Sequence, residues 1–184
     1  IKKIGEISSN AISKMRYEGA GTIEFLYENR NFFFIEMNTR LQVEHPITEA
    51  VFDVDLVKEQ INVASGAGMS FSQDSLVSTG HAIECRINAE RLPTFSPSPG
   101  NIKEFHSPGG IGIRMDSAIY NGFKVPPHYD SLIGKLIVHA ESRPLAISRL
   151  ARALDELIID GIYTTVDLFK EILGEENFKS GNYN

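Results

Sequence analysis

The sequence is poor in cysteine and in positive charge, and it contains no long apolar run. Cys85 is the only cysteine, which excludes an internal disulfide and fits a reducing compartment such as the cytoplasm. Eighteen basic residues against 24 acidic ones give a net charge of −6, so the broad basic footprint of a nucleic-acid-binding protein is absent. No apolar stretch approaches the roughly 20 residues of a membrane span. We therefore expect a globular protein that binds neither nucleic acid nor a membrane.

The first residues follow a helical pattern that has no start signal. Apolar residues recur at helical spacing at Ile4, Ile7, Ala11 and Met15. Ile1 is not an initiator methionine, and no capping residue precedes the pattern. We therefore expect the chain to begin inside a helix and to belong to a longer protein, so its function would be incomplete in these residues alone.

A shift toward glycine, serine and glutamine between residues 66 and 80 divides the sequence into two regions. We expect residues 1–70 and residues 80–184 to be separate domains joined by this linker. Both regions combine amphipathic helical patterns with β-rich runs bounded by turn residues. We expect the strands to be antiparallel, which places the fold in the α+β class.

The first region is predicted to continue from its helix into a β-hairpin over residues 21–38. Residues 40–46 are predicted to form a loop, because the proline at its end holds the preceding His45 extended. A helical segment is predicted over residues 47–66. Asp53 or Asp55 is the candidate N-cap of the second half of that segment.

The second region is predicted to begin with strands and to end with helices. Alternating apolar and polar residues predict strands over 81–89, 101–107, 110–119 and 131–140. An amphipathic helix is predicted over residues 143–160, and Gly161 ends it. Thr164 or Thr165 is the candidate N-cap of a last short helix.

Two acidic residues of the predicted hairpin, Glu24 and Glu36, belong to neighbouring strands. Side chains alternate along a strand, so Glu36 and Asn38 share one face. A two-residue loop at Asn29-Arg30 would place Glu24 opposite Ile35. A three-residue loop ending at a left-handed Asn31 would place Glu24 opposite Glu36.

Opposed carboxylates repel each other unless one is protonated or a cation lies between them. Two carboxylates and the amide oxygen of Asn38 are hard ligands that suit Mg²⁺ or Mn²⁺ together with phosphate oxygens. The alternative is a solvated hairpin face on which both glutamates point to water. The apolar run over residues 32–35 favours burial of this strand, and charges at the end of a buried strand need partners.

The segment after the hairpin contains Arg40, Gln42 and Glu44 at every second position. An arginine and a side-chain amide can together hold a small planar oxyanion, and a neighbouring glutamate can take a proton from it. The alternative is that Arg40 and Glu44 form an ordinary surface ion pair.

The strand predicted over residues 81–89 carries a second arginine, Arg86. Alternation places Arg86 on one face with Glu84 and Asn88, while Cys85 lies on the apolar face. We therefore expect Cys85 to be a small core residue and not a nucleophile. Arg86 could bind an anion, pair with Glu84 or cover the strand edge.

The segment FIEMNTRLQVEHPITE resembles the signature of biotin carboxylases, which are ATP-grasp enzymes. Further segments are similar to the same family in the same order, namely GTIEFL, FDVDLVKEQ, GHAIECRINAE, FSPSPG, PHYDSLIGKL and ELIIDGIYTTVDL. The resemblance extends over essentially the whole sequence, which makes it specific. It covers only the C-terminal part of the family's catalytic unit, so the glycine-rich ATP lid and the lysines of the nucleotide pocket lie outside these residues.

The resemblance implies a role for each matched residue. Glu24, Glu36 and Asn38 would coordinate Mg²⁺ (or Mn²⁺) that bridges the ATP phosphates, and Leu26 would touch the adenine. Arg40, Gln42 and the backbone N–H of Val43 would hold bicarbonate. Glu44 would be the general base that deprotonates bicarbonate for attack on the γ-phosphate, which gives carboxyphosphate. Arg86 would bind the ureido oxygen of biotin and stabilise its enolate.

The resemblance also implies partners, namely a biotin carboxyl carrier protein or domain and a carboxyltransferase component. A homodimer is expected for the full-length protein, with Ile111 and Arg114 near the subunit interface. Acetyl-CoA, propionyl-CoA and pyruvate carboxylases share this half-reaction, so the acceptor stays open. Two rivals also stay open: another ATP-grasp ligase such as a carbamoyl-phosphate synthetase, and a non-catalytic dimerisation or binding module.

Overall fold

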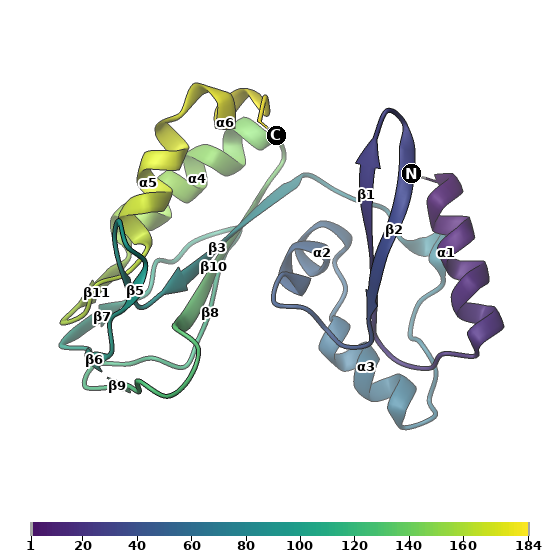
Figure 1. The fold of residues 1–184 in the computed structure, drawn as a ribbon, viewed down its shortest axis with the longest axis horizontal. Helices are drawn as coiled ribbons and strands as arrows, with labels where there is room; N and C mark the ends of the chain where they lie inside the picture. Colours follow the sequence, from purple (N-terminus) through teal and green to yellow (C-terminus); the bar gives the residue numbers. More distant parts are fainter. Residues whose placement is uncertain (1, 184) are drawn as a thin grey trace. The chain divides into compact units, whose positions relative to one another are not determined.

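The computed structural model describes residues 2–183, and the chain forms two compact units, residues 1–77 and 78–184 (Figure 1). Within its described residues, 2–77, the first unit contains three helices, one β-hairpin and a short 3-10 turn. Its elements are α1 (Lys2–Met15), β1 (Thr22–Glu28), β2 (Asn31–Asn38), α2 (His45–Phe52), α3 (Leu56–Ala64) and η1 (Gln73–Ser75).

The hairpin turns through a two-residue loop, yet Glu24 still lies opposite Glu36. Asn29 and Arg30 both have positive φ, at 50° and 64°, which is the conformation of a tight type I′ hairpin turn. The three-residue loop with a left-handed Asn31 is therefore wrong. The pairing register shifts between Glu24 and Phe25, where Ile35 is the extra residue of a β-bulge. This bulge supplies the one-residue shift that brings the two glutamates together.

The hairpin leaves much of its apolar surface exposed within the described chain. The four residues of the run from Phe32 to Ile35 are between 39% and 66% exposed, so the burial expected for this strand is not found. Aromatic rings instead contact one another along the hairpin. Phe25 makes edge-to-face contacts with Phe32 and Phe34, at centroid distances of 6.1 and 6.3 Å.

Helix α2 begins at His45, two residues before the predicted helical segment, and the expected extended conformation of His45 is wrong. A proline is tolerated in the first helical turn because the N–H that it lacks would have no partner there. Asp53 ends α2 in the left-handed conformation, with φ at 54°. Asp55 is the N-cap of α3, and its side chain accepts a hydrogen bond of 2.8 Å from Lys58 N.

The second unit is a small antiparallel sheet covered on one face by helices (Figure 1). Its strands are β3 (His81–Asn88), β4 (Glu90–Arg91), β5 (Ser96–Pro97), β6 (Gly100–Asn101), β7 (Glu104–His106), β8 (Ile113–Ser117), β9 (Lys124–Val125), β10 (Leu132–Ala140) and β11 (Ile158–Asp160). Its helices are α4 (Arg143–Glu156), α5 (Val166–Gly174) and α6 (Glu176–Ser180). The main sheet has the order β3-β10-β8, and β4–β5, β6–β9 and β7–β11 form separate two-stranded pairs.

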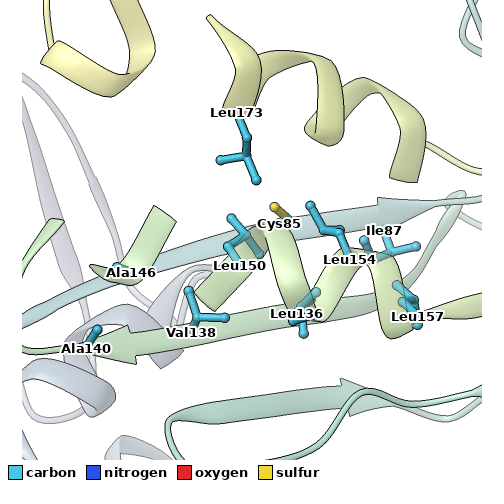
Figure 2. Packing of buried hydrophobic residues seen from close by; sticks show 11 residues of the cluster. Cys85, Ile87, Leu136, Val138, Ala140, Ala146, Leu150, Leu154, Leu157 and Leu173 are labelled. Atoms are coloured by element: carbon cyan, nitrogen blue, oxygen red, sulfur yellow. The ribbon is translucent and has the colours of Figure 1, made fainter. Parts of the chain in front are cut away.

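The core of the second unit lies between this sheet and α4 and α5. Figure 2 shows Leu150 and Leu154 of α4 beside Leu136 of β10, with Leu173 of α5 above them. Cys85 of β3 joins the same cluster and is only 3% exposed. Burial, and secondarily the charge of Glu84, raise the pKa of its thiol to about 12, so the prediction of an inert core cysteine is confirmed.

The end of α4 also differs from the prediction. Helix α4 ends at Glu156, and residues 158–160 form β11 instead of the last turn of the helix. These residues pair antiparallel with β7, where Ile159 faces Phe105. No helix within residues 2–183 is long and apolar enough to cross a membrane.

Candidate active site

The carboxylates of Glu24 and Glu36 converge on a single polar atom of the hairpin. Asn38 Nδ2 donates to Glu24 Oε1 at 2.8 Å and to Glu36 Oε1 at 3.2 Å. Glu24 is half-buried and Glu36 is exposed, so one side of this site is open to solvent. The structure therefore brings together all three residues that were expected to hold a divalent ion.

The geometry suits a cation between the two glutamates. The Asn38 amide nitrogen lies within hydrogen-bonding distance of one carboxylate oxygen of Glu24 and one of Glu36. A cation between these two oxygens would offset the repulsion of the two negative charges. Rotation of the Asn38 amide would present its oxygen and complete a set of hard ligands. Within residues 2–183 no group of three or more His, Cys, Asp or Glu residues could hold a metal ion, and the candidate metal site rests on two carboxylates and an amide.

The loop that follows β2 is joined to this site through Gln42. Gln42 Nε2 donates to Glu24 Oε1 at 2.7 Å, so the same carboxylate oxygen receives bonds from both amides. Arg40 is exposed, and its Nη1 donates to the backbone oxygen of Leu41 at 3.2 Å. The structure thus joins Gln42 to Glu24 of the candidate metal site and gives the Arg40 guanidinium a contact with its own loop.

Glu44 occupies the N-cap of α2, and its side chain makes no capping hydrogen bond. Glu44 is exposed at the end of the loop that follows β2, while Val43 before it is half-buried. Leu26, the residue expected to touch adenine, lies on β1 beyond Glu24 and is 57% exposed.

Sequence reasoning missed His45 and Glu49 as residues that fix this loop. His45 contacts the Gln42 carbonyl oxygen twice, through its backbone N at 3.3 Å and through Nδ1 at 2.9 Å. Glu49 is only 8% exposed, lies 4.0 Å from His45 Nε2, and accepts a hydrogen bond from Leu56 N at 2.9 Å. The i, i+4 spacing of this pair was a usable signal, but it required α2 to begin at His45.

Arg86 lies on β3 on the face of the sheet that turns away from the helices. Its side chain is 51% exposed, and its Nε lies 4.0 Å from Oε1 of Glu84, whose side chain is 6% exposed. Lys135 of β10 pairs with Arg86 in the ladder, and Lys135 Nζ lies 3.6 Å from Asp116 Oδ2. The same face therefore carries a row of charged residues across all three strands, in which Lys135 lies between Arg86 and Asp116.

Both units of this α+β chain, the one with the carboxylate-bearing hairpin and the one with the exposed strand arginine, match models of known families. Residues 84–184 match the family model of the biotin carboxylase C-terminal domain. Residues 1–71 match the model of the carbamoyl-phosphate synthase L chain, ATP binding domain. The chain belongs to the biotin carboxylase family.

Known proteins support this membership over the full chain. The chain is 55% identical to the biotin carboxylase of Haemophilus influenzae over all of its length and 41% of that protein. It is 53% identical to a pyruvate carboxylase subunit of Methanothermobacter thermautotrophicus, over 98% of this chain and 37% of that protein. The chain thus spans about two fifths of the length of these curated relatives.

Solved structures agree with the predicted fold. The biotin carboxylase domain dimer of the Hydrogenobacter thermophilus 2-oxoglutarate carboxylase, with MgADP, ADP and bicarbonate, has a TM-score of 0.96 and 42% identity, covering 100% of this chain and 41% of that one. The biotin carboxylase of Campylobacter jejuni in its beta-gamma-ATP complex has a TM-score of 0.95 and 46% identity, with the same coverage. The α+β fold and the family resemblance are confirmed.

Proposed function

We propose that the full-length protein carboxylates biotin, using ATP and bicarbonate, and that residues 1–184 supply the C-terminal part of its active site. The observation that carries this proposal is the convergence of Glu24 and Glu36 on one point beside Asn38. Relatives named biotin carboxylase at 52–55% identity, and a homologous domain bound to MgADP and bicarbonate, support it.

Glu24, Glu36 and Asn38 hold Mg²⁺ (or Mn²⁺) in this proposal. When bound there, the ion would neutralise charge on the phosphates of ATP. The two carboxylates supply negative charge from neighbouring strands, and Asn38 turns its amide oxygen inward. Leu26, exposed on the same strand as Glu24, supplies an apolar contact for adenine.

The loop after β2 binds and activates bicarbonate. Arg40, Gln42 and the N–H of Val43 hold the anion, and Glu44 accepts its proton. A bicarbonate oxygen then attacks the γ-phosphorus of ATP, the bond to ADP breaks, and carboxyphosphate forms. The 2.7 Å hydrogen bond from Gln42 to Glu24 links this anion site to the metal site.

Arg86 serves the second half of the reaction. Its guanidinium binds the ureido oxygen of biotin and stabilises the negative charge that develops there as N1′ takes the carboxyl group of carboxyphosphate, while the proton of N1′ leaves with the released phosphate. Biotin arrives on a carrier protein or domain, and a carboxyltransferase component passes the carboxyl group to an acyl acceptor. The acetyl-CoA carboxylase reaction of fatty acid synthesis and the pyruvate carboxylase reaction both fit. The proposal includes a homodimer and a cytoplasmic location, although some plant relatives are named chloroplastic.

A second function applies to residues 1–184 taken alone, namely a non-catalytic binding or dimerisation module. The chain spans about two fifths of its relatives, and Leu26 and its neighbours on the hairpin are exposed. Isothermal titration of the 184-residue protein with ATP and Mg²⁺ distinguishes the two functions. Absence of detectable binding favours the module.

The catalytic proposal is tested by Glu24→Gln in the full-length protein, with Glu28→Gln as the matched control at the exposed end of the same strand. We expect Glu24→Gln to lower bicarbonate-dependent ATP cleavage roughly hundredfold, and to shift the Mg²⁺ titration to higher concentrations. Glu28→Gln should behave as the parent. Equal activity and equal Mg²⁺ dependence of the parent and Glu24→Gln would exclude this carboxylate as a metal ligand.

A further inference from the structure

The outer edge of strand β3 is held by a side chain instead of a neighbouring strand. One edge of β3 pairs with β10, and no strand within residues 2–183 pairs with the other. Thr165 lies against that edge and makes three hydrogen bonds with it. Asn88 N donates to Thr165 Oγ1 at 3.0 Å, Thr165 Oγ1 donates to Arg86 O at 3.2 Å, and Thr165 N donates to Asn88 O at 3.1 Å.

The Thr165 side chain makes two of these bonds instead of a capping hydrogen bond to its own helix, α5. It is the N-cap of α5, where a threonine hydroxyl ordinarily accepts a hydrogen bond from an N–H of the first turn. The Thr165 side chain makes no such bond, because its oxygen is directed at β3. The residue is only 4% exposed. The sequence predicted a capping threonine here, and the structure shows that its hydroxyl is used elsewhere.

The bonds from Thr165 fall where the pairing on the other edge of β3 is irregular. Leu132 pairs with Asn88 and Gly134 with Ile87, so the register between β10 and β3 shifts by one residue at this point. A bulge of this kind leaves one residue unpaired and interrupts the regular ladder of hydrogen bonds, so β10 holds the backbone of β3 less firmly at this point. Thr165 supports the opposite edge of the same residues.

We propose that Thr165 is a positioning residue for Arg86, which rests on the biotin-binding role proposed above for that arginine. Ile87, next in the strand, is fully buried, so a backbone fixed at Arg86 O and Asn88 N also fixes the direction in which the Arg86 side chain leaves β3. The guanidinium is half-exposed and is anchored near its base by Glu84. A small rotation of the backbone is therefore amplified at the end of this long side chain.

The test uses Thr165→Val, Thr165→Ser and Thr164→Val in the full-length protein. Valine keeps the shape of threonine and the bond from the backbone N–H but removes the hydroxyl, whereas serine keeps the hydroxyl. Thr164 is the adjacent threonine and makes none of the three bonds. We expect Thr165→Val to lower kcat/KM for free biotin roughly ten- to hundredfold, with bicarbonate-dependent ATP cleavage in the absence of biotin unchanged. Thr165→Ser should restore biotin carboxylation, and Thr164→Val should match the parent.

Two results would overturn the inference. One is that Thr165→Val leaves biotin carboxylation unchanged. The other is that it lowers carboxylation and biotin-independent ATP cleavage in equal proportion, as a purely structural residue would. Arg86→Lys, measured in parallel, tests the role on which the inference rests. If Arg86→Lys carboxylates biotin as the parent does, the proposed role of Arg86 fails. If it loses only biotin carboxylation while Thr165→Val does not, the inference about Thr165 fails alone.

Discussion

At the scale of single residues, the Asp116 carboxylate is paired with two basic side chains on the sheet face that turns away from the helices. Arg114 Nε and Nη2 donate to its two oxygens at 2.7 and 2.8 Å, and Lys135 Nζ lies 3.6 Å away. The hydrogen bonds from Arg114 are the main cause that lowers the pKa of Asp116, and the charges of Arg114 and Lys135 add to it against the opposing effect of partial burial. The ion pair of Asp116 with Arg114 therefore makes the free energy of unfolding depend on pH.

A carboxyl group whose pKa is lower in the folded state than in the unfolded state stabilises the folded protein. This stabilisation is fully present above the pKa of the unfolded state, which is about 4. The contribution is lost as the pH falls through the folded pKa. We expect Asp116→Asn to lower the free energy of unfolding by about 1 kcal/mol at neutral pH, and to lose less stability than the parent on acidification. Urea unfolding over a series of pH values measures both effects.

The control for this prediction is Asp155→Asn. Asp155 pairs with Lys170 at 3.0 Å, but its side chain is 74% exposed, so the pair contributes little in water. Its replacement should leave the pH dependence of unfolding as it is in the parent. Parallel stability curves for Asp116→Asn and the parent would contradict the prediction.

At the scale of elements, the turn between β11 and α5 depends on Gly161. Its φ is +99°, and a Cβ at this position would lie 2.3 Å from the backbone oxygen of Asn101 and 3.0 Å from Lys103 N. The close approach allows Lys103 N to donate to Asp160 O at 2.8 Å, which joins the two segments. The same turn leads directly into Thr165, so its conformation also determines where α5 begins.

We expect Gly161→Ala to destabilise the folded state by about 1–3 kcal/mol, because both the left-handed backbone and the contact with Asn101 must change. Gly174→Ala is the matched control, since a Cβ at this end of α5 meets nothing within 4 Å. Alanine there should be neutral or stabilising by up to about 1 kcal/mol. Chemical denaturation compares the two, and equal effects of the two substitutions would refute the steric explanation.

The sequence predicted elements better than their junctions. Amphipathic periodicity identified α4, and strand alternation identified β3 and β10, because each pattern repeats over many residues. Sequence patterns missed β11, because the apolar stripe of α4 continues into Ile158 and Ile159 without a break. Whether these residues extend a helix or pair with β7 is decided by a tertiary contact with Phe105, which no local pattern contains.

The candidate site shows the same limit at finer scale. Strand alternation was enough to place Glu36 and Asn38 on one face. The position of Glu24 depended on the bulge at Ile35, whose effect on register is invisible to loop-length rules. Thr164 or Thr165 was recognised as a candidate cap from its position before a helix, but the bonds of Thr165 to Arg86 and Asn88 span more than 70 residues of sequence. Such long-range partners cannot be inferred from spacing.

At the scale of the whole molecule, the full-length protein is proposed to be a homodimer, and Ile111 is the residue best placed to test this. It is 91% exposed in the segment between β7 and β8. The segment is fixed on both sides, because Arg152 Nη2 donates to Gly109 O at 3.1 Å and His139 N donates to Gly112 O at 2.9 Å. A rigid loop that presents an isoleucine to solvent is a suitable contact for a second copy of the protein.

We expect Ile111→Glu in the full-length protein to weaken self-association at least roughly tenfold, because a carboxylate would lose its hydration in an apolar contact. Leu145→Glu is the control, since Leu145 is also exposed, at 52%, but lies in the first turn of α4, where a glutamate is favourable. Sedimentation velocity over a concentration series should show a dimer for the parent and for Leu145→Glu, and a shift toward monomer for Ile111→Glu. A parent that stays monomeric at micromolar concentrations would refute the homodimer, whereas an Ile111→Glu variant that dimerises as tightly as the parent would place the interface elsewhere.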